Sequence, residues 1–231
     1  VTVLNLPASF WHVLVEEMQA RGLPLPRCVR LVVTGSERII ASALADWQRI
    51  APHCVWMNGY GPTEATITCT TFTQAPGSVV DPTQDVPIGR PLAHARAYVL
   101  AFDGSLAPLG AEGNLHIGGP AVTLGYLNQP EITASVFLPD PFEGEGRLYR
   151  TGDRAVWRAD GQLLFLGRRD RQVKLRGLRI DLGDVERALG QFEGLRDVRV
   201  AVHAAGSDAA RLVAWVCGPD LRAGSPALAA L

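Results

Sequence analysis

The sequence has few cysteines, no excess of either charge and no long apolar run, and each absence excludes a class of protein. The four cysteines form no C-x-x-C pair and the five histidines do not fall at metal-ligand spacings, so reduced buried thiols are favoured over disulfides or zinc. Lys plus Arg totals 22 against 23 for Asp plus Glu, which argues against nucleic acid or an anionic membrane as a partner. Without a membrane-length apolar run or a secretion signature, we expect a cytoplasmic protein.

The residues that are present can bury a core, since 47% are hydrophobic and 19% charged. Residues 1–75 alternate strand-like and helix-like stretches, which predicts a layered α/β sheet. The expected strands are Val1–Leu6, Val29–Thr34, Cys54–Met57 and Ala65–Phe72, and the expected helices run from Pro7 to about Arg21 and from Glu37 to about Ile50. In the first helix, Phe10, Val13, Leu14 and Met18 share one predicted face.

Two further parts of the chain have different residue patterns. Residues 76–168 alternate short apolar runs with turn signals, which predicts a β-barrel-like part or a set of hairpins with one short helix at Pro130–Phe137. Residues 169–231 read as a small α+β lid. Its expected parts are a basic loop, a helix at Asp184–Phe192, strands at Val198–His203 and Arg211–Cys217, and a polar turn at 206–208. We expect both ends of the chain to be cuts, the last inside a helix starting at Pro226.

The most informative string is N-G-Y-G-P-T-E at residues 58–64, directly after a predicted strand. At the carboxyl edge of an open α/β sheet such a string faces the ligand crevice. Tyr60 offers a ring for stacking on a nucleobase, Asn58 an amide for a base edge, and Thr63 a hydroxyl for phosphate. Glu64 offers a carboxylate for Mg²⁺. The alternative interpretation is a Gly-Pro turn whose polar residues only cap backbone groups.

Two more strings carry ionisable groups. Y-R-T-G-D at 149–153 ends in Asp153, which could accept from both hydroxyls of a ribose, although Asp after Gly is commonly a turn residue. Residues 167–186 read G-R-R-D-R-Q-V-K-L-R-G-L-R-I-D-L-G-D-V-E, and on charge alone this is a solvated basic loop.

Taken together and in order, these strings resemble the core motifs of non-ribosomal peptide synthetase adenylation domains, members of the ANL group of adenylating enzymes. N-G-Y-G-P-T-E resembles the family's N-x-Y-G-P-T-E, and Y-R-T-G-D resembles Y-[RK]-T-G-D. G-N-L-H-I-G-G at 113–119, followed by G-Y-L at 125–127, resembles G-E-L-x-I-x-G…G-Y-L. The resemblance covers nearly the whole chain and implies an incomplete ANL fold.

The resemblance also implies a role for each motif residue. Tyr60 would stack on adenine, Asn58 would meet its edge, Thr63 would contact the α-phosphate region and Glu64 would hold Mg²⁺. The remaining expected nucleotide-site residues are Gly61, Asp153 on the ribose hydroxyls, Phe165 near the nucleotide and Arg168 on the ribose or phosphate side. Asp170 would be the hinge of the small domain, and Lys174 and Gly177 would face the site in the thioester-forming state.

The implied reaction is activation of an amino acid by ATP to an aminoacyl-adenylate, followed by transfer to the phosphopantetheine thiol of a carrier domain. The implied partners are peptidyl carrier and condensation domains, with neither nucleic acid nor membrane. By the same resemblance the amino-acid pocket would be lined by Asn5, Val33, Gly35, Gly59, Ile67 and Thr68, with the two glycines leaving room. Ordinary packing at strand ends is the alternative for each of these six.

Some of the family's pattern is absent from this sequence. The phosphate loop S-G-T-T-G-x-P-K and the C-terminal N-G-K motif do not occur, so we expect the chain alone to be inactive. Asn114 stands where the family usually has Glu, and Asp181 and Asp184 also replace Glu. Two rival interpretations stay open: an acyl-CoA ligase of the same superfamily, and a degenerate, non-catalytic scaffold module.

Overall fold

The computed structural model describes residues 1–144, 146–175, 177–204 and 210–219. The chain divides into two compact units, Val1–Arg169 and Asp170–Leu231. The turn expected at 206–208 and the helix start expected at Pro226 lie outside the described residues.

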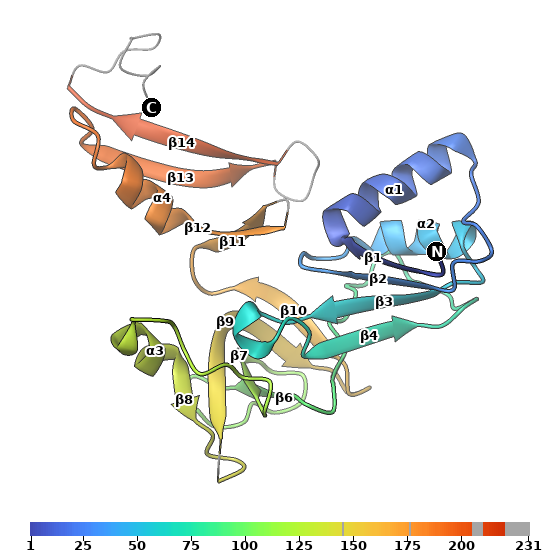
Figure 1. Cartoon of the computed structure of the whole chain (residues 1–231), viewed down its shortest axis with the longest axis horizontal. Helices are drawn as coiled ribbons and strands as arrows, with labels where there is room; N and C mark the ends of the chain where they lie inside the picture. Colours follow the sequence, from blue (N-terminus) through green and yellow to red (C-terminus); the bar gives the residue numbers. More distant parts are fainter. Residues whose placement is uncertain (145, 176, 205–209, 220–231) are drawn as a thin grey trace. The chain divides into compact units, whose positions relative to one another are not determined.

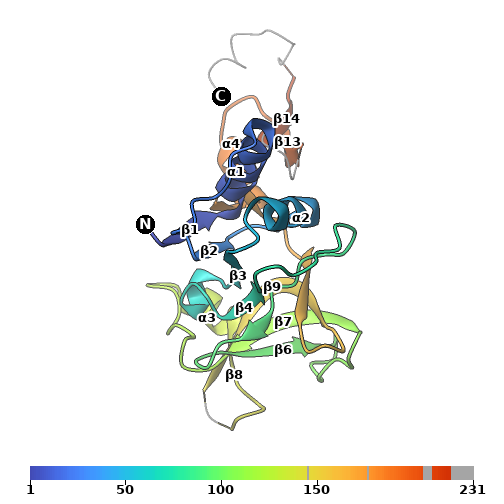
Figure 2. The ribbon, with the colours of Figure 1, turned by 90° about the vertical axis from the view of Figure 1, so that its right-hand side faces the viewer.

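The first unit begins with a five-stranded sheet in the order β1-β2-β3-β4-β5 (Figure 1). Its strands are β1 (Val3–Pro7), β2 (Leu31–Gly35), β3 (Val55–Tyr60), β4 (Thr70–Gln74) and β5 (Arg90–Pro91). Strands β1, β2 and β3 pair in parallel, whereas β4 pairs antiparallel with both β3 and β5. The parallel strands are joined through α1 (Ala8–Arg21) and α2 (Ala41–Ile50), which cover one face of the sheet (Figures 1 and 2). This confirms the α/β prediction.

Three fully buried tryptophans fill the space between these helices and the sheet. The ring centroid of Trp11 lies 5.9 Å from that of Trp47 and 5.3 Å from that of Trp56. The predicted face of α1 was therefore wrong in part, because Phe10 and Val13 are exposed. The buried face is Ala8, Trp11, Val15 and Met18. The predicted set and the buried set both have helical spacing. The indole ring of Trp11, which is larger than the phenyl ring of Phe10, occupies the core.

The second sheet of this unit is antiparallel, with the order β10-β9-β7-β6 and β8 paired to β9. Its strands are β6 (Arg96–Leu100), β7 (Glu112–Gly118), β8 (Phe137–Pro139), β9 (Arg147–Trp157) and β10 (Leu163–Arg168), and α3 is Pro130–Val136. Gly89, just before β5, pairs with Leu163 and links the two sheets. The hairpins are as predicted, while closure into a barrel stays a prediction.

The second unit contains two hairpins and one helix. Strands β11 (Gln172–Leu175) and β12 (Leu178–Asp181) pair with each other, as do β13 (Asp197–His203) and β14 (Arg211–Cys217), and α4 spans Leu182–Leu189. The expected basic loop is thus largely a hairpin, because Val173, Leu175, Leu178 and Ile180 supply the apolar residues of paired strands. The helix ends before Phe192, which is exposed.

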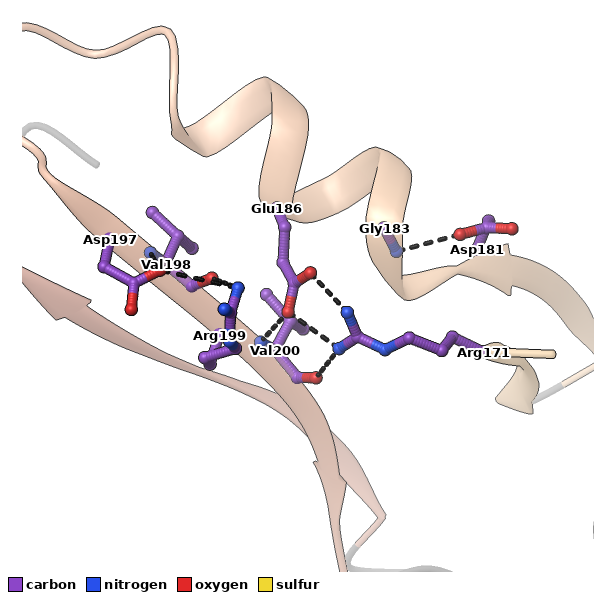
Figure 3. A network of polar contacts seen from close by, with 8 residues as sticks. All are labelled: Arg171, Asp181, Gly183, Glu186, Asp197, Val198, Arg199 and Val200. Atoms are coloured by element: carbon purple, nitrogen blue, oxygen red, sulfur yellow. Dashed lines mark hydrogen bonds and ion pairs between the residues drawn. The ribbon is translucent and has the colours of Figure 1, made fainter.

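One carboxylate ties the helix of the second unit to its neighbours (Figure 3). Glu186 points from α4 and accepts from Arg171 Nη2 at 2.7 Å and from the Val200 backbone N–H at 2.8 Å. Arg171 also donates to the Val200 carbonyl at 3.2 Å. The arginine, followed by the backbone N–H, lowers the pKa of Glu186 to about 2. This network joins the start of the unit, its helix and β13.

Candidate functional site

The end of β3 and the middle of β9, which belong to different sheets, meet through Tyr60 and Asp153. The Tyr60 hydroxyl donates to Asp153 Oδ2, across 93 residues of sequence. Arg168 Nη1 lies 2.6 Å from Asp153 Oδ1, and Arg168 Nη2 donates to the Thr151 carbonyl at 3.0 Å. The side chains of Arg168 and Asp153 are only 16% and 8% exposed, so this ion pair is shielded from water.

Local strand geometry explains why these three side chains converge. Asp153 lies inside β9 and not in a turn; its backbone N–H donates to Thr151 Oγ1 at 3.0 Å, and that hydroxyl donates to the Leu115 carbonyl at 2.8 Å. The pairing of β9 with β10 shifts register between Phe165 and Gly167. This bulge places Arg168 directly opposite Asp153.

The aromatic part of the site consists of the Phe165 ring and the Tyr60 phenol. The ring centroids of Tyr60 and Phe165 lie 6.4 Å apart, at an interplanar angle of 38°. Burial, followed by the neighbouring Asp153 carboxylate, raises the pKa of Tyr60 well above its ordinary value. The phenol therefore stays neutral at physiological pH and donates a hydrogen bond to the carboxylate.

The strand predicted at Ala65–Phe72 is wrong in its first half. Thr63–Ala65 form a short 3₁₀ helix, and Thr66 and Ile67 have positive φ angles of 57° and 69°. Thr and Ile favour strands, but here the loop folds back onto the end of β3. A Cβ at Gly61 would lie 2.4 Å from the Ile67 carbonyl oxygen, so only glycine permits this approach.

The folded-back loop separates the two polar residues of the motif. Thr63 is exposed, whereas Glu64 is 7% exposed. The Tyr126 hydroxyl donates to Glu64 Oε1 at 2.5 Å. Burial and the hydrogen bond to Glu64 raise the pKa of Tyr126, so its phenol remains a donor.

The amide group of Asn58 is engaged in a hydrogen bond within the protein. Its side chain is buried, and Nδ2 donates to the Pro87 carbonyl at 2.9 Å. In this structure the amide group holds the segment before β5 against β3. Its expected contact with an adenine edge stays a prediction.

A magnesium ion fits the donors that this unit provides. In the described part of the chain no cluster of three or more His, Cys, Asp or Glu side chains could hold a metal by itself. Mg²⁺ bound together with a nucleotide commonly needs only one or two carboxylates, because phosphates and water complete its shell. The buried Glu64 carboxylate is therefore compatible with the role expected for it.

The structure brings some of the six expected pocket residues together in pairs. Asn5 and Val33 are paired neighbours on β1 and β2, and the exposed side chain of Asn5 lies on the sheet face away from the helices. Gly59 and Thr68 adjoin each other, since a Cβ on Gly59 would lie 3.4 Å from Thr68 Cγ2. Ile67 is 75% exposed.

Gly35 does not leave room in the way expected. A Cβ there would lie 2.5 Å from the backbone oxygen of Gly59, its pairing partner on β3. This glycine allows two backbones to approach and does not enlarge a pocket. Asp170 and Lys174 belong to the second unit, where Asp170 Oδ1 accepts from the Gln172 N–H at 3.1 Å and Lys174 is exposed on β11.

Sequence reasoning missed the partners that hold the site together. Pro87 carried no recognisable signal. Thr151 stands in the Y-R-T-G-D string and Tyr126 in the G-Y-L string, but nothing in the sequence linked Thr151 to Arg168 or Tyr126 to Glu64.

The chain belongs to the AMP-binding enzyme family, whose model matches residues 1–127. The motif resemblance to non-ribosomal peptide synthetase adenylation domains is confirmed by relatives and by solved structures. No helix in the described residues combines the length and apolar character needed to cross a bilayer.

Three relatives illustrate this kinship. The chain is 48% identical over 166 residues to phosphinothricin tripeptide synthetase PhsB of Streptomyces viridochromogenes, 41% over 218 residues to malpibaldin synthetase of Mortierella alpina, and 39% over 201 residues to tyrocidine synthase 2 of Brevibacillus parabrevis. These matches cover 71%, 94% and 87% of this chain. They span only 14%, 4% and 6% of the relatives.

Solved structures of similar fold agree. Holo-PA1221, an NRPS protein containing adenylation and PCP domains bound to a vinylsulfonamide inhibitor, superposes with a TM-score of 0.84 at 29% identity, covering 99% of this chain and 39% of that one. NpsA-ThdA, an artificially fused adenylation-PCP di-domain from Klebsiella oxytoca, gives 0.80 at 27% identity, covering 95% and 40%.

Proposed function

We propose that this chain forms part of an adenylation domain that activates an amino acid with ATP and passes it to a carrier-domain thiol. One observation carries the proposal: Tyr60, Asp153 and Arg168, from three separate motifs, are joined in one shielded cluster beside Phe165. A ring, a carboxylate and a guanidinium suit an adenine, a ribose diol and a phosphate respectively. The peptide synthetase relatives support the same reaction.

Formation of the adenylate depends more on positioning of the two substrates than on covalent catalysis by the protein. The substrate carboxylate attacks the α-phosphorus of ATP, and pyrophosphate leaves. Asp153 would hold the ribose, while Thr63 would contact the α-phosphate region. Mg²⁺, held by Glu64, would supply neutralisation of phosphate charge when bound. Lys174 and the hinge Asp170 would serve the later thioester-forming state.

The larger assembly follows from the same proposal. Two of the similar structures are named as adenylation domains joined to PCP domains, which supports a phosphopantetheine-bearing carrier as partner. A condensation domain, a cytoplasmic location, a β-barrel-like second part and a lid formed by residues 169–231 belong to this proposal too. The chain lacks the S-G-T-T-G-x-P-K and N-G-K strings, so the 231 residues alone would not complete the reaction.

Amino-acid-dependent exchange of pyrophosphate into ATP tests this function. The intact protein that contains this chain should catalyse exchange with at least one amino acid and not with fatty or aryl acids. The isolated 231-residue chain should catalyse none. Exchange driven only by fatty or aryl acids would identify an acyl-CoA ligase instead, and a silent intact protein would favour the scaffold interpretation.

A further inference from the structure

The G-Y-L string at 125–127 lies against the N-G-Y-G-P-T-E string, a contact that the proposed function does not yet use. One hydrogen bond joins the two strings directly, and two more involve residues that flank them. The Tyr126 hydroxyl donates to Glu64 Oε1 at 2.5 Å, the Thr123 N–H donates to the Glu64 carbonyl at 2.9 Å, and Thr66 Oγ1 donates to the Ala121 carbonyl at 2.6 Å. Both the backbone and the side chain of Glu64 are therefore held by residues about 60 positions away.

Tyr126 is itself fixed in place. Its backbone N–H donates to Thr133 Oγ1 at 2.9 Å, and its ring meets that of Phe137 edge-on with centroids 5.6 Å apart. The preceding residue must be glycine, because a Cβ on Gly125 would lie 2.3 Å from Thr133 Cγ2. The loop that carries Tyr126 is therefore anchored to α3 through Thr133 and packs on Phe137 of β8.

We propose that Tyr126 is a positioning residue that orients the Glu64 carboxylate for a divalent cation bound with the nucleotide. This inference rests on the proposed function. A buried carboxylate can adopt several rotamers, and a donor that holds one of its oxygens favours some of them over others. Hydrogen-bond partners of metal ligands typically change metal affinity or activity by about 10- to 100-fold when they are removed.

The test uses Tyr126→Phe in the intact protein that contains this chain, with Mn²⁺ as a spectroscopic probe. Binding of Mn²⁺ in the presence of α,β-methylene-ATP is followed by electron paramagnetic resonance. We expect the apparent Kd for Mn²⁺ to rise about 10-fold or more. AMP affinity measured in EDTA should change less than about twofold, since the ring and its packing remain. Tyr98→Phe, where the ring stacks on Phe142, is the matched control and should leave both constants unchanged.

A double-mutant cycle with Glu64→Gln completes the experiment. If Tyr126 acts through Glu64, adding Tyr126→Phe to Glu64→Gln weakens Mn²⁺ binding no further. Equal losses of Mn²⁺ binding and metal-free AMP binding in Tyr126→Phe would show a merely structural role and overturn the inference, as would unchanged Mn²⁺ binding. If the wild-type protein itself binds neither probe, the proposed function fails instead.

Discussion

At the scale of single residues, two glycines of one motif have different roles. Gly61 lies against the carbonyl of Ile67, so that a Cβ would sit 2.4 Å away. Gly59 would place its Cβ at ordinary contact distance, 3.4 Å from Thr68 Cγ2. The first glycine is needed for the backbone fold of the loop, and the second borders the expected substrate pocket.

Substitution of these glycines by alanine should separate stability from specificity. Gly61→Ala should lower the free energy of unfolding by about 1–3 kcal/mol, because the backbone must move away from the added methyl group. Gly59→Ala should leave it within about 1 kcal/mol, since alanine suits a strand at least as well as glycine. Urea unfolding and pyrophosphate exchange across a panel of amino acids measure the two effects.

Gly59→Ala should shift the preference toward smaller amino acids, because its methyl group projects beside Thr68. Equal stability losses in the two variants would contradict the distinction. An unchanged substrate panel in Gly59→Ala would place the pocket elsewhere.

At the same scale, the sequence identified the motif residues but not all of their contacts. Tyr60 and Asp153 were expected to share a nucleotide, and they share a hydrogen bond. Asn58 was expected at a base edge and donates to Pro87. A motif specifies residue types at a site, whereas the partner of each polar group depends on backbone segments that approach only in the folded chain.

At the scale of elements, α4 depends on the ion pair between Arg171 and Glu186. The pKa of Glu186 is lowered to about 2 in the folded chain, below its ordinary value of 4.5. The stabilising contribution is therefore present above about pH 4.5 and is lost as the pH falls toward 2. Glu186 accepts from β13 as well, so its protonation weakens the contact between helix and strand.

Hydrogen exchange measures this pH dependence locally. Protection factors of the β13 amides should fall between pH 6 and pH 3 in the wild type. That difference should shrink in Glu186→Gln. Asp184→Asn is the control, because its ion pair with Arg187 is largely exposed and contributes little. The same pH response in all three proteins would contradict the role assigned to Glu186.

Element types were more predictable than element boundaries. The α/β alternation of residues 1–75 and the hairpins of 76–168 follow from periodicity and turn residues. The end of the predicted strand at Met57 and the start of another at Ala65 were wrong, because β3 continues to Tyr60 and the loop after it folds back. The close approach of the Gly61 and Ile67 backbones, together with the long-range contact between Glu64 and Tyr126, overrides the strand preference of Thr66 and Ile67.

At the scale of the whole molecule, the candidate site depends on three strands from two different sheets. Segments 93 residues apart bring a phenol and a carboxylate together, and Arg168 on a third strand completes the cluster. The order of the motifs predicted this meeting only through resemblance to a family. The spacing of the motifs alone does not predict the contact between Tyr60 and Asp153. The two sheets are linked by the pairing of Gly89 with Leu163, and neither residue belongs to a motif.

The most direct measurement compares ATP with 2′,3′-dideoxy-ATP in pyrophosphate exchange by the intact protein, with and without Asp153→Asn. If Asp153 holds the ribose diol, the wild type should prefer ATP by about 10- to 100-fold in kcat/KM, the equivalent of about 1.5–3 kcal/mol for hydrogen bonds to a charged group. Asp153→Asn should lower activity with ATP and bring the ratio close to one. A ratio that survives the substitution unchanged would contradict the nucleotide site described here.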